Sequence, residues 1–186
     1  EGLRALRERA RGETMAEAVR FSAEIGVSGT AAHPDGRIVM TGHQPELYHP
    51  GVWVKDFLVD RLAGETGASG LDLVVDTDAV APVALRVPCL RDGVRECEVV
   101  LAEGDAGAAY VQRPGPPQAA RDDFRARGME LLGSLPAPAL GRHFASFCDA
   151  LDESAASAGD LGTLMTAARR RYEASAGTRY LEVLAS

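Results

Sequence analysis

The chain has 186 residues, 46% of them hydrophobic, which is enough for a medium-sized domain with a substantial core. Its net charge of −7 argues against nucleic acid as a partner, because phosphate binding needs concentrated Lys and Arg. No run of 18 apolar residues occurs, so we expect no membrane span. The cysteines, Cys89, Cys97 and Cys148, show no CxxC spacing, and we interpret them as reduced thiols of a cytoplasmic protein.

The N-terminal residues 2–25 have the pattern of an amphipathic helix, with Gly12 as a point where it could divide. We expect this helix to pack on a sheet or on a partner. Residues 26–36 have the composition of a loop, and Pro34-Asp35-Gly36 is a turn signal.

The next stretch predicts a strand, a glycine-containing loop and a helix. The apolar run Ile38-Val39-Met40 is long enough for a buried strand, and Thr41-Gly42 follows it directly. A helix is expected over residues 52–63, ended by the glycines that follow. Its spacing predicts one apolar face, made of Val52, Trp53, Val54, Phe57, Leu58 and Leu62.

A second apolar strand is predicted over residues 71–75, ending at Asp76-Thr77-Asp78. Strand, helix and strand within about 40 residues form a βαβ unit, so we expect a parallel pair with a right-handed crossover. Residues 83–101 alternate around Arg91-Asp92-Gly93 and predict a β-hairpin, with Pro88 at an edge or a bulge.

The C-terminal part is helical in pattern after a Gly- and Pro-rich loop, residues 103–118, that has the composition of a mobile segment. Helices are expected over residues 118–133, 138–152 and 160–175. Arg169-Arg170-Arg171 on the last of them predicts a solvated face paired with acidic residues, with anion binding as the alternative.

These elements predict an α/β fold: a Rossmann-like βαβ core with a β-hairpin and a helical C-terminal part. The expected domains are an N-terminal helix (1–30), a Rossmann-like α/β core (31–117) and a helical region (118–186). The chain begins without Met and ends on an apolar run, so we expect it to continue in a longer protein.

The best candidates for chemistry lie where the first strand meets its helix. Imidazoles at His43 and His49, with the amide of Gln44, are suited to acid–base catalysis or to contacts with phosphate. Lys55 would neutralise negative charge, and the helix N-terminus would stabilise it further. The alternative is that His43 and His49 only cap the helix and hold the loop in place.

The second candidate is the pair Asp76 and Asp78 at the end of the second strand. Two carboxylates in a D-x-D pattern can hold Mg²⁺ or Mn²⁺, and through the cation a nucleotide diphosphate. Because parallel strands end at one edge of a sheet, we expect both side chains beside His43 and Gln44. The alternative is that these aspartates only form a turn or a helix cap.

Residues 37–88 resemble the family of the cysteine-adding enzymes of bacillithiol biosynthesis. In that family a strand leads into a Thr-Gly-Gln-Gln motif, a glycine-rich stretch and a helix containing Lys, and a second strand ends in acidic residues. The matching positions here are Thr41, Gly42, His43 (in place of the first Gln), Gln44, Gly51, Lys55, Asp76 and Asp78. The resemblance implies a core related to nucleotidyl-transfer folds, with Thr41, Gly42 and Gly51 among the substrate-binding residues. The triplet His43-Gln44-Pro45 also resembles the WbqC-like family of bacterial surface-sugar pathways.

From these features we expect a transferase or ligase that binds a nucleotide or a phosphorylated small molecule. Its cofactors would be a nucleotide and either Mg²⁺ or Mn²⁺. Its partners would be a small-molecule substrate and either a second copy of the chain or the remainder of a longer protein. Two other readings stay open: a non-catalytic binding or scaffold module of a larger protein, and a metal-dependent sugar-nucleotide transferase.

Overall fold

The computed structural model describes residues 2–27, 36–89 and 93–186. The chain divides into two compact units, each of which is described by itself. Unit 1 comprises Glu1–Gln44, Tyr48–Asp76 and Glu173–Ser186, and unit 2 comprises Pro45–Leu47 and Thr77–Tyr172. Unit 2 is therefore an insertion, in chain order, between parts of unit 1.

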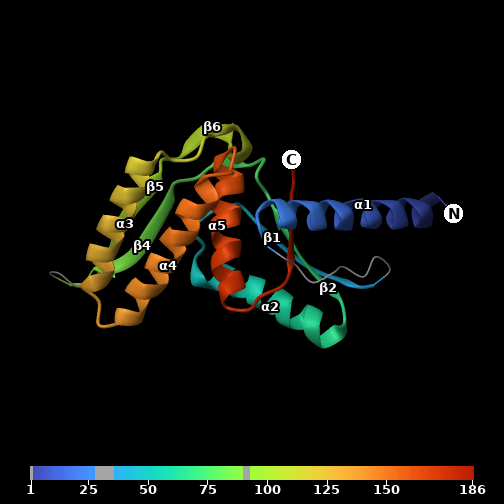
Figure 1. The fold of residues 1–186 in the computed structure, drawn as a ribbon, viewed down its shortest axis with the longest axis horizontal. Coiled ribbons are helices and arrows are strands. Elements are labelled where there is room, and N and C mark those ends of the chain that lie inside the picture. The colour runs from blue at the N-terminus through green and yellow to red at the C-terminus, as the bar shows by residue number, and fades with distance from the viewer. Residues whose placement is uncertain (1, 28–35, 90–92) are drawn as a thin grey trace. The chain divides into compact units, whose positions relative to one another are not determined.

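Unit 1 contains a parallel sheet of three strands in the order β1-β2-β7 (Figure 1). These strands are β1 (Ile38–His43), β2 (Ser69–Val74) and β7 (Leu181–Leu184). The predicted parallel pairing of the first two strands is confirmed, with Thr41 opposite Asp72 and His43 opposite Val74. β7 comes from a segment that we had placed in a helical region, and it pairs with the other side of β2. The mixed α/β class is thus confirmed, whereas a Rossmann-like core stays a prediction, because the parallel sheet has three strands.

The two faces of this sheet are covered by different helices of unit 1. On one face, α1 (Gly2–Glu24) packs Met15 and Ala18 against apolar side chains of β2 and β7. The sheet residues in that cluster are Ile38, Leu71, Leu73, Leu181 and Val183. On the other face, α2 (Pro50–Thr66) comes so close that a Cβ on Gly70 would lie 3.2 Å from Val59 and 3.3 Å from Ala63.

The predicted N-terminal helix is confirmed as one continuous helix that Gly12 does not divide. Its buried residues lie in its second half, whereas Leu3 and Leu6 near its start are exposed. Within unit 1, Ser22 accepts a hydrogen bond from the backbone N–H of Glu182 at 3.0 Å, which ties this second half to β7.

The prediction of which side of α2 faces inward was wrong. The buried residues of α2 are Asp56, Val59 and Ala63, whereas Val54, Phe57 and Leu58 are between 37% and 58% exposed. The cause is the approach of α2 to Gly70, since small and medium side chains fit that spacing. The end of α2 follows the prediction, because Gly67 adopts a left-handed conformation (φ 62°) and its N–H bonds to the carbonyl of Ala63.

The expectation of a buried first strand also needs correction. β1 lies at the edge of the sheet, and its Met40 is 60% exposed. An apolar run of three residues was therefore compatible with an edge strand as well as with an interior one.

Unit 2 contains two antiparallel strand pairs and three helices. The predicted hairpin is confirmed as β4 (Val83–Cys89) paired with β5 (Arg95–Ala102), and Pro88 lies in a two-stranded sheet, where both strands are edges. The predicted helices are confirmed as α3 (Gln118–Gly133), α4 (Pro138–Ala155) and α5 (Leu161–Ser175), whose last residues belong to unit 1. The turn signal at Pro34-Asp35 and the hairpin tip at Arg91 and Asp92 lie outside the described residues.

The segment 103–118 is more ordered than its composition predicted. It forms β6 (Asp105–Ala109), which pairs with β3 (Ala79–Val80), and then a 3-10 turn, η1 (Tyr110–Gln112). Tyr110 is fully buried, and its hydroxyl donates to Glu46 at 3.0 Å and accepts from the N–H of Ala81 at 3.1 Å. Burial raises the pKa of Tyr110 well above its usual value, so this phenol stays protonated. These contacts hold residues 45–47 within unit 2.

The arginine run on α5 is not a solvated face. Arg170 is fully buried and Arg169 is 5% exposed, while Arg171 is half-buried and forms an ion pair with Glu153 at 3.8 Å. The reason is that α5 is enclosed on most sides, as its neighbours Met165 and Ala168 are also buried.

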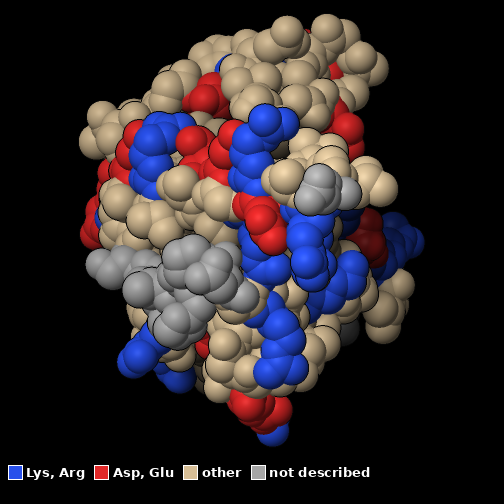
Figure 2. All heavy atoms as spheres, turned by 90° about the vertical axis from the view of Figure 1, so that its right-hand side faces the viewer, with Lys and Arg blue, Asp and Glu red and all other residues tan. Residues whose placement is uncertain are grey.

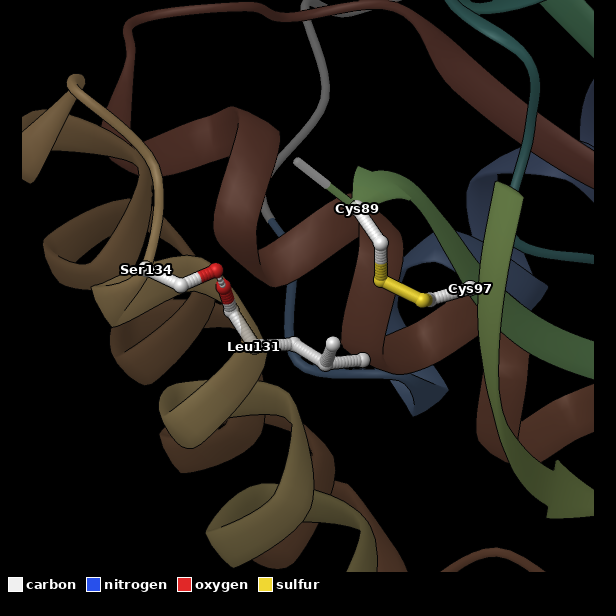
Figure 3. Close-up of a disulfide and its surroundings, with 4 residues drawn as sticks. All are labelled: Cys89, Cys97, Leu131 and Ser134. Carbon is white, nitrogen blue, oxygen red and sulfur yellow. Dashed lines mark hydrogen bonds between the residues drawn. A yellow bond between two sulfur atoms is a disulfide. The ribbon is translucent and has the colours of Figure 1, made fainter. Parts of the chain in front are cut away.

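Cys89 and Cys97 form a disulfide across the hairpin, which corrects the expectation that all three cysteines are reduced (Figure 3). Their sequence separation is 8 residues, so the bridge closes a short loop at the hairpin tip. Cys148 is buried as a free thiol, and burial raises its pKa to about 12. At neutral pH this thiol is protonated and unreactive.

None of the described helices is long and apolar enough to span a membrane. On the face of the molecule in Figure 2, basic and acidic side chains are intermixed rather than segregated. On α1, the exposed Arg20 forms ion pairs with both Glu17 and Glu24.

We predict that Gly128→Ala destabilises unit 2. A Cβ at this buried position on α3 would lie 2.4 Å from the ring of Phe144 on α4, so the ring must move. The free energy of unfolding, measured by urea denaturation, should fall by about 1–2 kcal/mol. Gly133→Ala is the matched control, because nothing lies within 4 Å of a Cβ there, and it should not destabilise. Equal effects of the two variants would contradict the described packing of α3 on α4.

We predict that the unfolded, unreduced protein has one thiol that reacts with Ellman's reagent, and that the native protein has none. The single thiol is Cys148, while reduction before unfolding should release three. The Cys97→Ser variant should lower the free energy of unfolding by about 2 kcal/mol, since the short loop is no longer closed. Three reactive thiols without reduction would restore the original expectation of reduced cysteines.

Candidate functional site

Unit 1 contains a buried cluster of three side chains that can donate to a cation: His43, Asp56 and Asp72. One ligand atom from each lies within 4.8 Å of the others. His43 Nδ1 is 3.5 Å from Asp72 Oδ1 and 3.7 Å from Asp56 Oδ1. Both aspartate side chains are fully buried, and the His43 side chain is 6% exposed. Among the described residues this is the one group with such an arrangement.

Three different elements bring these residues together. His43 is the last residue of β1, Asp72 lies within the central strand β2, and Asp56 lies in the second turn of α2. In the parallel register Asp72 is opposite Thr41, two residues before His43, so the side chains of all three strand residues leave the same face of the sheet. That face is the one covered by α2.

The His43 ring is held on its other side by neighbouring residues of unit 1. Its Nε2 lies 3.2 Å from the hydroxyl of Thr41, and the ring of Tyr48 packs at a centroid distance of 5.0 Å. Among the described residues, Nδ1 has no hydrogen-bond partner. Nδ1 is therefore the atom of this ring that points to the two carboxylates.

This geometry permits two kinds of chemistry. A neutral imidazole and two carboxylates are ligands that can hold a divalent transition metal ion. Alternatively, a protonated His43 can form an ion pair with the aspartates, and a carboxylate can orient the imidazole for acid–base catalysis.

The glycines and the glutamine of the motif have distinct positions. Gly42 packs against β2, where a Cβ would lie 3.0 Å from the carbonyl oxygen of Leu73, so this position serves the close approach of two strands. Gly51 donates its N–H to the ring of His49. Gln44 is half-buried and follows His43 directly at the end of unit 1's first segment.

His49 does not join the cluster but caps α2. Its Nδ1 accepts the N–H of Gly51 at 3.1 Å, and its side chain is exposed. Helix capping was the alternative role predicted for His49 from the sequence. Lys55 is also exposed, because it lies one residue from Asp56 and so on another side of α2. The structure thus leaves both residues outside the cluster.

The two aspartates after β2 also lie outside the cluster. Asp76 is fully buried in unit 1, and its Oδ1 accepts the N–H of Ser186 at 3.0 Å. Asp78 is exposed and belongs to unit 2. The expected cation pair of Asp76 and Asp78 stays a prediction from the sequence.

Asp56 and Asp72 are the residues that the sequence reasoning missed. A signal was present for Asp72, which interrupts an otherwise apolar strand, whereas the sequence does not distinguish Asp56 from Asp60 and Glu65 on the same helix. A lone carboxylate inside an apolar element marks a buried charge. A further buried acid, Glu173, accepts hydrogen bonds from Trp53 and Tyr180 in the same unit.

Comparisons with protein-family models, with curated proteins and with solved structures find no match to this chain. The similarity of its motif to the cysteine-adding enzymes and to the WbqC-like family therefore stays a prediction from the sequence. The geometry of unit 1 alone carries the functional argument.

We predict that His49→Ala lowers the free energy of unfolding by about 1 kcal/mol, because α2 loses its N-cap. His49→Asp should recover most of this stability, since a carboxylate also accepts N–H groups at a helix start. Thermal denaturation of both variants checks this. If His49→Asp were as unstable as His49→Ala, the cap would not be the role of His49.

Proposed function

We propose that the chain is an enzyme, a transferase or ligase, that binds a nucleotide or another phosphorylated small molecule beside His43. The observation that supports this most is the unbonded Nδ1 of His43, buried between the carboxylates of Asp56 and Asp72. Structural histidines usually have both nitrogens satisfied when buried, so this arrangement favours a functional ring.

The location of the cluster also favours this proposal. His43 ends β1, and in open α/β sheets ligands bind outside the carboxyl ends of parallel strands. The N-terminus of α2 belongs to the same βαβ unit, and the partial positive charge of a helix N-terminus favours a negatively charged ligand.

In this proposal each residue of the motif has its own role. His43 is the group that reacts or binds at the site, and Asp56 and Asp72 orient its ring. Gln44 follows His43 directly in the chain, Thr41 contacts Nε2 of the His43 ring, and Gly42 provides the close packing of β1 on β2. His49 serves the site indirectly, as the cap of α2.

The test is a thermal-shift screen of the whole chain with nucleotides, amino acids and nucleotide-sugars, followed by an assay of turnover for each ligand that binds. A ligand at a hundred times its Kd should stabilise the fold by about 2.7 kcal/mol, a readily measured shift. We expect a phosphorylated ligand to raise the melting temperature of the protein, and His43→Ala to remove that response. Glu65→Gln, at an exposed position on α2, should leave this response unchanged.

Two results would count against the proposal. Binding that His43→Ala leaves intact would put the ligand elsewhere on the chain. Binding that depends on His43 but leads to no turnover would favour the non-catalytic binding module over the enzyme.

A further inference from the structure

We propose that His43, Asp56 and Asp72 form a binding site for a divalent transition metal ion of the Zn²⁺ class. This deepens the function proposed above, on whose site it rests, by naming the cofactor. It also replaces Asp76 and Asp78 as the cation ligands. The ligand atoms are His43 Nδ1 and one carboxylate oxygen each from Asp56 and Asp72.

Two of the three spacings between the ligand atoms fit a coordination sphere, and the third, between the two aspartate oxygens, is at most 4.8 Å. In a tetrahedral site with bonds of about 2.0–2.1 Å, neighbouring ligand atoms are about 3.4 Å apart. The distances from His43 Nδ1 to the two Oδ1 atoms are 3.5 and 3.7 Å. These distances fit two edges of such a site.

The same distances are too long for direct hydrogen bonds from a protonated imidazole. A charge-assisted N–H···O bond draws its heavy atoms to about 2.7–2.9 Å. His43 Nδ1 makes no such bond among the described residues, although its side chain is more than nine-tenths buried. A metal ion bound between the three atoms explains why His43 Nδ1 has no hydrogen bond.

The ligand types select the class of metal. Ca²⁺ takes six to eight oxygen ligands, and Mg²⁺ prefers octahedral oxygen sites whose neighbouring ligands are about 3.0 Å apart. One imidazole with two carboxylates instead suits Zn²⁺ and its neighbours in the first transition series. Three protein ligands also leave a fourth position, where water or a substrate oxygen would bind.

Thr41 provides the outer support that such a site requires. A metal bound at Nδ1 requires the proton on Nε2, and the hydroxyl oxygen of Thr41 lies 3.2 Å from Nε2, where it can accept a hydrogen bond from Nε2–H. The ring of Tyr48 packs against the same imidazole and limits its rotation. Thr41 is accordingly a positioning residue for the metal ligand.

The experiment is calorimetric titration of the metal-free whole chain with Zn²⁺, beside thermal-shift measurements with Zn²⁺, Mg²⁺ and Ca²⁺. We expect Zn²⁺ to bind one site and raise the melting temperature, and the other two cations to do neither. Asp72→Asn keeps the side-chain size and should weaken Zn²⁺ binding at least tenfold. Thr41→Val should weaken it about tenfold. Glu65→Gln is the control, as an exposed carboxylate on α2 whose loss should not matter.

Because Asp72→Asn could alter the fold, Co²⁺ offers a second measurement on the wild type. Tetrahedral coordination of Co²⁺ by His43 and the aspartates should give visible d–d absorption that an excess of Zn²⁺ removes. The proposal is overturned if the wild type binds no Zn²⁺, or if Asp72→Asn binds it as tightly as Glu65→Gln does.

The two proposals fail in different ways. If a phosphorylated ligand stabilises the chain, His43→Ala removes that effect and the wild type binds no Zn²⁺, the proposed function holds and the metal site is wrong. If Zn²⁺ binds as expected but no phosphorylated ligand does, the metal site holds and the proposed substrate class is wrong.

Discussion

The central strand β2 imposes the constraint on which unit 1 depends. A strand with neighbours on both sides needs partners for all its backbone N–H and C=O groups. β1 provides one set, from just before α2, and β7 provides the other, from the last residues described. The chain must therefore return to unit 1 after forming the whole of unit 2. Segments far apart in the sequence are thus required for one small sheet.

The pairing around β2 explains how charged residues come to be buried beneath α2. Asp72 lies in β2 and Glu182 lies opposite it in β7, on the face that α2 covers, and both are fully buried. Asp56 of α2 faces the same layer. Burial of a charged group costs several kcal/mol unless it is compensated, and that is a large part of the 5–15 kcal/mol by which domains are stable. Carboxylates in such positions therefore need compensating partners in the folded protein.

Elements with strong local signals could be predicted from the sequence. The helices of unit 2 follow from their periodicity and from the prolines at Pro136 and Pro138, and the hairpin follows from its alternation. The parallel pairing of β1 and β2 follows from the short distance between them along the chain. Each of these depends on neighbours in sequence, which is the information that a single sequence holds.

Features decided by contacts distant in sequence could not be predicted in this way. β7 forms a strand because β2 has an open side, and four apolar-rich residues give no sign of that partner. The inward side of α2 depends on the absence of a side chain at Gly70, and this reverses the hydrophobic pattern of the helix. For the same reason Asp56 was missed, because its position became an inward one only through that close approach. The site residues on β1 were found by their motif, and their partners on α2 and β2 were not.

The motif itself combines residues with different tasks. Residues 41–44 belong to unit 1, residues 45–47 to unit 2, and Tyr48 to unit 1 again. Glu46 bonds to Tyr110, and Leu47 packs on the apolar core of unit 2, so these two residues stabilise that unit. His43 and Tyr48 contact each other beside the buried aspartates of unit 1. The aspartates under α2 lie outside the motif. They therefore support a functional site without relying on the motif's resemblance to other families.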